Sequence, residues 1–157
     1  MSNVLILAEH DGGKISKTAA ELATLGKRAG SVTAVVLAPA GQADALAAQL
    51  ANTEIEKVAL VESDDFSRHG IPALVDALSQ IVNLQTPKAV LIPSTARGKE
   101  IAGRLAVRIG GGVITDAVDL NSDLGATQSV FGGSFTVSSK IKTGTPVITV
   151  RPSAVEA

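Results

Sequence analysis

Apolar runs and amphipathic helical segments alternate four times along this chain between Asn3 and Ile109. The first run, Asn3–Ala8, is apolar after its first residue, which is typical of a strand covered on both faces by helices. Each run is followed by a segment whose apolar residues recur every three or four positions. Successive strand–helix units fold by right-handed crossovers onto one shared sheet. The alternation therefore predicts an α/β domain of three layers, α/β/α, with a mainly parallel sheet.

Turn and capping residues set the expected boundaries of these units. Thr18 and Glu21 form a capping-box pattern for a helix that ends at Gly30, and Pro72 suits the first turn of a later helix. A polar turn, Ser94–Gly98, precedes the helix that stops at Gly110. The strands are expected at 3–8, 31–38, 57–61 and 89–93, and the helices at about 18–30, 43–50, 72–82 and 99–109.

The pattern changes in the last third of the chain. Short extended segments replace the strand–helix units, with partial alternation of apolar and polar residues around Phe135–Ser139. We expect a β extension with at least one antiparallel pair, built from segments 113–120, 128–131, 134–141 and 146–150. Residues 1–152 are predicted to form one domain, and residues 153–157 a tail.

Composition excludes several classes of function. The sequence has no cysteine, which rules out disulfides, thiolate metal sites and thiol catalysis. Its net charge of −1 supplies no field that would hold a polyanion, so we expect no nucleic acid partner. No apolar run reaches the roughly 18 residues that span a bilayer. We expect a protein that is not embedded in a membrane.

Ligands of parallel sheets usually bind at the carboxyl ends of the strands. There, the turn Ser94–Lys99 places hydroxyl and basic groups at a helix N-terminus, which favours an anion. A phosphate loop of the Walker type has a hydroxyl residue after its lysine, whereas Glu100 follows Lys99 here. The turn Asp11–Lys14 could likewise approach a ligand through its glycines. We favour a helix cap for the first turn and a tight turn for the second.

Other polar residues are more readily explained as surface groups than as sites. His10 and His69 are far apart in the sequence, without the carboxylate or cysteine spacing of a metal site. The acidic run of Glu62, Asp64 and Asp65 could hold a cation, but a solvated loop is its usual meaning. We therefore predict no catalytic and no metal-binding residue.

Five sequence blocks carry a family resemblance. They are, in order, Val4–His10, Gly98-Lys99, Arg104–Ala106, Ile114–Asp116 and Thr145–Pro152. Together they resemble the N-terminal domain of the alpha subunit of electron transfer flavoproteins. The resemblance covers essentially the whole chain. It departs from the family at Gln128-Ser129, where an Arg-Pro pair is usual.

The resemblance implies an adenine nucleotide alpha hydrolase-like fold and a role in electron transfer. In that family the alpha subunit pairs with a beta subunit, and the heterodimer carries electrons from dehydrogenases to a quinone oxidoreductase or another acceptor. FAD is held mainly by a second, C-terminal domain of the alpha subunit, so we expect no cofactor and no redox activity in this isolated chain.

The same resemblance implies that this domain docks the beta subunit, in the bacterial cytoplasm or the mitochondrial matrix. Arg97, Arg104 and Asp116 are the candidate contact residues, together with the late β segment. Arg97, Arg104 and Arg108 are spaced to form a basic stripe beside the inward face of their helix. Solvated surface explains this stripe equally well.

A second hypothesis is a free-standing domain of the universal-stress-like kind that binds a small nucleotide. It shares the strand–helix alternation. Such proteins have a late phosphate pattern that ends in Gly-Ser or Gly-Thr, and Gly110–Val113 does not supply it. His10–Ser16 likewise lacks the Ser-Gly-Gly and Asp-Ser pairs of a pyrophosphatase-type loop.

Overall fold

The computed structural model describes residues 3–51 and 53–157, so Met1, Ser2 and Asn52 of the predicted domain lie outside the described residues. The strands are β1 (Asn3–Leu7), β2 (His10–Asp11), β3 (Lys14–Ile15), β4 (Ser31–Ala38), β5 (Lys57–Glu62), β6 (Ala89–Pro93), β7 (Val113–Leu120), β8 (Ala126–Val130), β9 (Phe135–Ser139) and β10 (Val147–Val150). The helices are α1 (Thr18–Lys27), α2 (Ala43–Ala48), α3 (Asp65–His69), α4 (Ile71–Gln85) and α5 (Ala96–Arg108).

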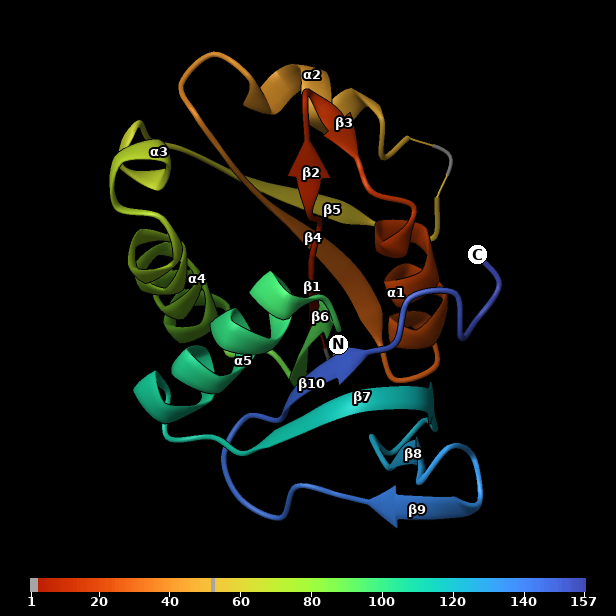
Figure 1. Cartoon of the computed structure of the whole chain (residues 1–157). Coiled ribbons are helices and arrows are strands. Elements are labelled where there is room, and N and C mark those ends of the chain that lie inside the picture. Colours follow the sequence, from red (N-terminus) through yellow and green to blue (C-terminus); the bar gives the residue numbers. More distant parts are fainter. Residues whose placement is uncertain (1–2, 52) are drawn as a thin grey trace.

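Three layers confirm the predicted architecture. Within the described ranges the strands form an eight-stranded sheet in the order β5-β4-β1-β6-β10-β7-β8-β9, and β2 pairs with β3 in a separate hairpin. Helices α1 and α2 cover one face of the sheet, and α3, α4 and α5 lie over the other (Figure 1). Each face has its own apolar core, because the side chains of the central strands point alternately to the two sides. None of the helices in the described ranges is long and apolar enough to cross a bilayer.

Strand β1 lies between two parallel partners. It pairs with β4 on one side and with β6 on the other. The chain therefore leaves β1 toward one edge of the sheet and later returns to place β6 on the opposite side. This is a topological switch point, where the loops after neighbouring strands diverge and leave a crevice.

The predicted position of β10 was wrong. We expected 146–150 to belong to the β extension, but β10 lies inside the sheet and pairs in parallel with both β6 and β7. Its four residues are all buried. A short apolar run fits a central parallel strand as well as an edge strand, so local sequence could not distinguish the two positions.

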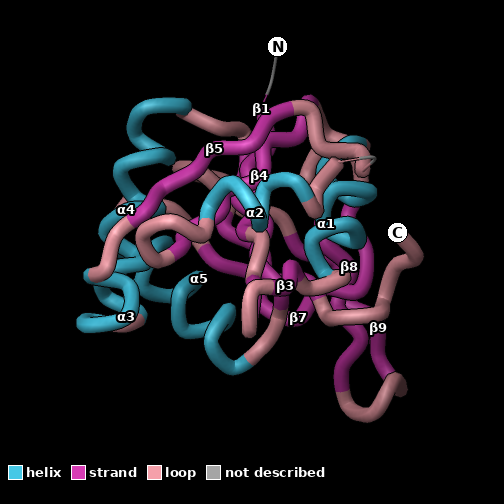
Figure 2. Tube along the Cα trace, turned by 90° about the horizontal axis from the view of Figure 1, so that it is seen from above, coloured by secondary structure: helices cyan, strands magenta, loops and turns pink. Residues whose placement is uncertain are grey.

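The rest of the β extension agrees with the prediction. Strands β7, β8 and β9 pair in antiparallel fashion, and β9 forms the edge of the sheet. The turn between β8 and β9 projects from the body of the domain (Figure 2). At its tip Phe131, Gly132 and Gly133 all have positive φ.

The start of α1 differs from the predicted capping box. Lys17 occupies the N-cap position without a side-chain cap hydrogen bond, and the Thr18 hydroxyl donates to Ser16 instead. Glu21 is buried and accepts from the backbone N–H of Ser153 at 2.9 Å. The predicted tail, 153–157, thus begins with a residue hydrogen-bonded to α1, a partner that a local motif could not reveal.

Candidate functional site

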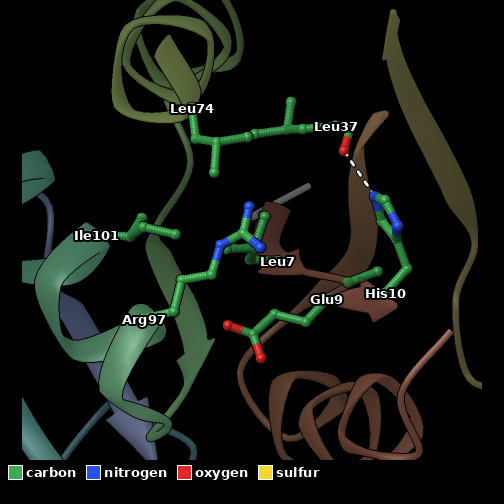
Figure 3. A pocket seen from close by; sticks show the side chains of 8 residues that line it. Leu7, Glu9, His10, Leu37, Leu74, Arg97 and Ile101 are labelled. Atoms are coloured by element: carbon green, nitrogen blue, oxygen red, sulfur yellow. Dashed lines mark hydrogen bonds between the residues drawn. The ribbon is translucent and has the colours of Figure 1, made fainter. Parts of the chain in front are cut away.

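A cleft lies at the carboxyl ends of β1 and β4, beside the N-terminus of α5. Glu9 and His10 follow β1, Leu37 lies near the end of β4, and Arg97 is in the first turn of α5 (Figure 3). The order β4-β1-β6 brings these separate segments to one edge of the sheet. The cleft thus occupies the topological switch point, where open α/β sheets usually bind ligands.

Glu9 is fixed by the cap of α5. Thr95 is the N-cap residue, and its Oγ1 accepts from the backbone N–H of Gly98 at 2.9 Å. The same hydroxyl donates to the Glu9 carboxylate, 3.0 Å from Oε1. Burial raises the pKa of Glu9 above its ordinary value, and the Thr95 hydrogen bond and the Arg97 charge oppose that rise. The helix-cap interpretation of the turn 94–99 is confirmed.

His10 and the glycine turn both have structural roles, of which the sequence indicated only that of the turn. The His10 Nε2 atom lies 2.8 Å from the Leu37 carbonyl oxygen, so the ring joins the loop after β1 to β4. Gly12 and Gly13 connect β2 to β3 with φ of 53° and 76°, conformations that favour glycine. The tight-turn interpretation of Asp11–Lys14 is therefore confirmed.

Arg97 faces the cleft. Its guanidinium reaches over Leu7, with Leu74 and Ile101 on one side and Glu9 on the other (Figure 3). The guanidinium forms no hydrogen bond and no ion pair with residues 3–51 or 53–157. Arg97 borders both a small cavity of ≈ 30 Å³, which Glu9 and several apolar side chains also line, and a wider cleft of ≈ 730 Å³. A guanidinium placed in this way can bind an anionic group of a ligand or partner.

Asp116 belongs to a second polar cluster, in the middle of β7 and beside the end of β10. It accepts from Arg151 Nη2 at 2.7 Å, and Arg151 also donates to the Ser129 carbonyl. Asp116 has a positive φ of 60°, beside an irregularity in the β10–β7 register. The Arg151 hydrogen bond holds the pKa of Asp116 below its ordinary value, against a smaller opposing effect of burial.

We predict a pH-dependent effect of Asp116→Asn. Asparagine tolerates positive φ, so the backbone is preserved while the charge is lost. Because the folded-state pKa is lowered, ionised Asp116 stabilises the fold above its ordinary pKa of 3.8, and this contribution is lost as the pH falls through the folded-state value. The variant should be less stable than the wild type at neutral pH and equally stable in acid. Urea unfolding at a series of pH values tests this, and a pH-independent difference would contradict it.

The predicted basic stripe is divided, because Arg97 borders the cleft while Arg104 and Arg108 border a separate hollow between α4 and α5. Arg97 lies at the cleft, whereas Arg104 pairs with Glu100 on its own helix at 2.9 Å. Arg108 pairs with Asp76 of α4. Arg97 and Arg104 are also about 10 Å apart along the axis of α5. The structure therefore does not bring the candidate contact residues Arg97, Arg104 and Asp116 into one cluster.

The acidic run after β5 is structural. Glu62 accepts from the backbone N–H of Ala43 at 2.8 Å and so caps α2. Hydrogen bonds from Ala43 and its neighbours lower the pKa of Glu62. Asp64 and Asp65 begin α3, a short helix that sequence reasoning missed. Among the described residues, no three His, Asp or Glu side chains are placed to hold a metal ion.

The late hairpin carries an exposed apolar surface, formed by Phe131, Phe135 and Val137. Their exposed fractions are 80%, 63% and 40%. The two rings meet edge to face with centroids 5.6 Å apart. The sequence signal for this surface is that two of the chain's three aromatic residues flank a Gly-Gly turn in a polar segment. Such surface apolar clusters mark interaction sites.

Comparison with known proteins identifies the family. Residues 4–157 match the model of the electron transfer flavoprotein domain. The chain is 43% identical over its full length to the electron transfer flavoprotein subunit alpha of Mycobacterium tuberculosis, and 41% identical to that of Mycobacterium leprae, covering 49% of each. It is 30% identical to Protein FixB of Rhizobium meliloti over 96% of the chain and 46% of that protein. The chain thus spans about half the length of these relatives. It belongs to the electron transfer flavoprotein domain family and corresponds to the N-terminal domain of the alpha subunits.

Proposed function

We propose that this chain is the docking domain of an electron transfer flavoprotein alpha subunit. It binds a beta subunit within an FAD-containing heterodimer, which carries electrons from dehydrogenases to a quinone oxidoreductase or another acceptor. Similarity of the whole chain to about half of each alpha subunit supports this function over a universal-stress-like nucleotide-binding domain. Relatives with bacterial sources and a mitochondrial name support action in the bacterial cytoplasm or the mitochondrial matrix.

The exposed hairpin surface of Phe131, Phe135 and Val137 is the observation that carries the docking role. It lies on β9 and the turn that precedes it, at the edge of the sheet, where β9 pairs with β8 on one side and is unpaired on the other within the described residues. An edge strand can extend its hydrogen bonding to a partner, and exposed aromatic side chains supply apolar contact area. A protein partner that covers this edge would bury both the free backbone groups of the edge strand and the exposed aromatic side chains.

The backbone of Phe131 supports a functional origin for this surface. Phe131 has φ of 53°, in the left-handed region that costs an L-residue with a bulky side chain roughly 1–2 kcal/mol. The following residues, Gly132 and Gly133, adopt similar φ at little cost. A phenylalanine at this position is therefore unfavourable for the isolated fold and is consistent with selection for binding.

Two features of the cleft argue against a tightly held flavin. In the cleft, Glu9 and Asp11 offset the charge of Arg97, so a pyrophosphate would be opposed by acidic groups. The Gly98 amide at the N-terminus of α5 is already bonded to Thr95. We therefore propose that FAD in the complete heterodimer is held outside this domain and that the isolated chain is redox-inactive.

A chimera tests the proposed function. This chain would replace the N-terminal half of the Mycobacterium tuberculosis alpha subunit, and the chimera would be co-expressed with a tagged beta subunit. We expect the chimera to co-purify with the beta subunit and to retain flavin, measured by absorbance. Failure to co-purify, although the chimera is folded by circular dichroism, would contradict the docking role. Retention of flavin by the isolated chain would contradict the inference about the cofactor.

We predict that Phe131→Gly combined with Phe135→Ser weakens this assembly. Loss of two exposed aromatic anchors should raise the dissociation constant for the beta subunit about tenfold or more. Glycine suits the φ of Phe131, so the fold should remain intact. Leu84→Ser is the matched control, because Leu84 is also apolar and 84% exposed but lies on α4. Equal affinities of the two variants, measured by surface plasmon resonance with the chimera, would refute the hairpin as the docking surface.

A further inference from the structure

Opposite charges face the cleft at the end of β1 without forming an ion pair. The Glu9 carboxylate and the Arg97 guanidinium both border the small cavity and interact electrostatically, yet no nitrogen–oxygen pair between them lies within 4.0 Å. The Arg97 guanidinium has no hydrogen-bond or ion-pair partner in the described part of the chain. Because Arg97 also borders the wider cleft, a molecule that enters there can present an anion to Arg97 and a cation to Glu9.

The Glu9 carboxylate retains hydrogen-bonding capacity for such a cation. Its contacts with Thr95 use a single hydroxyl, which lies 3.0 Å from Oε1 and 3.3 Å from Oε2. A carboxylate has about four lone-pair sites, so several remain for the N–H groups of an ammonium. On the opposite side, the fork of a guanidinium matches a ligand carboxylate in bidentate geometry.

The floor beside these charges is apolar. Leu7, Leu37, Leu74 and Ile101 line the cavity of ≈ 30 Å³. Glu9, His10 and Arg97 also line the cavity, so it has a charged side and an apolar side. A short alkyl group suits the apolar side, because it removes the surface of the four apolar side chains from water.

We propose that this cleft binds a small aliphatic α-amino acid. The ligand carboxylate pairs with Arg97, its ammonium pairs with Glu9, and its alkyl side chain enters the cavity among the four apolar residues. The adjoining cleft of ≈ 730 Å³ falls within the range of small-molecule sites, about 300–1,000 Å³, and provides access. This binding is independent of the proposed docking role, since the hairpin surface and the cleft share no residue.

Titration calorimetry on the 157-residue chain tests the proposal with ligands that each lack one group. We expect heat from valine or leucine, weaker binding of leucinamide, which lacks the carboxylate, and weaker binding of 4-methylpentanoate, which lacks the ammonium. Inorganic phosphate and AMP serve as anion controls. Heat from phosphate or AMP without heat from the amino acids would overturn the proposal, as would no heat from either amino acid at millimolar concentration.

Three variants test which ligand group pairs with Arg97 and which with Glu9. Arg97→Gln and Glu9→Gln should each weaken leucine binding about tenfold or more, the expected effect of losing a charge-assisted contact. Glu9→Gln should have little effect on the binding of 4-methylpentanoate, because this ligand has no ammonium group to pair with Glu9. Arg104→Gln is the matched control, because Arg104 lies on the same helix and pairs with Glu100 outside the cleft. Unchanged leucine binding by the first two variants, with thermal unfolding like the wild type, would refute the assignment.

Discussion

Gly98→Ala should destabilise the domain by about 3 kcal/mol, the upper part of the range for forcing extra atoms into a packed site. An added Cβ at Gly98 would overlap the backbone carbonyl oxygen of Pro93 and press on Thr95 Oγ1. The carbonyl belongs to the end of β6 and cannot move away as a flexible side chain could. For a domain of this size the loss corresponds to a decrease in Tm of about 6–12 °C.

Gly103→Ala provides the control on the same helix. An added Cβ at Gly103 meets no atom within 4 Å, and alanine is the better helix former. This variant should gain about 0.5–1 kcal/mol. Thermal unfolding, monitored by circular dichroism, measures the change in Tm of both variants. If the two variants changed Tm in the same direction, the close approach of α5 to the end of β6 would be wrong.

Leu105→Ala should cost about 2–5 kcal/mol, because it removes a fully buried side chain and leaves a cavity. Leu105 belongs to the core between α5 and the sheet, together with Leu78 of α4 and Val147 of β10. The loss would be a large part of the roughly 5–15 kcal/mol that stabilises a typical domain. Urea unfolding should show a lower midpoint with an unchanged m value.

Val107→Ala is the corresponding control. Val107 lies two residues further along α5 and is 85% exposed, so its truncation should change the stability by no more than about 0.5 kcal/mol. A similar loss for both variants would mean that α5 presents a different face to the sheet.

Elements with strong local signals were predictable. The strand Ala89–Pro93 was predicted with its observed bounds, since its residues are all buried and polar turns flank it. Pro72 marked the start of α4, which begins one residue earlier. In both cases the residues that define the element lie within it, so periodicity and turn chemistry were sufficient.

Elements defined by distant partners were not predictable. The capping-box prediction failed because Glu21 bonds to Ser153, a residue from the far end of the chain. The central place of β10 depends on which strands it joins, and its sequence does not encode those partners directly. Helix α3 was missed because five residues give too little periodicity for recognition.

The cleft likewise has features that local sequence predicts and features that depend on the order of the strands. The loop Glu9–Lys14 and the turn Ser94–Lys99 could be chosen in advance, because both follow predicted parallel strands. The approach of Glu9 to Thr95 requires the order β4-β1-β6, which the sequence alone leaves open. The exposed position of Arg97 at the cleft also depends on how α5 is oriented on the sheet.

The central position of β10 affects how the protein can be made. During synthesis the ribosome releases β1, β4, β5 and β6 early and the β7–β9 meander later, yet the two groups are joined only through β10. Until Val147–Val150 emerges, one edge of β6 and one edge of β7 remain unpaired. Open edges of this kind invite aggregation. The eight-stranded sheet therefore cannot close until β10 has left the ribosome, however early its other strands emerge.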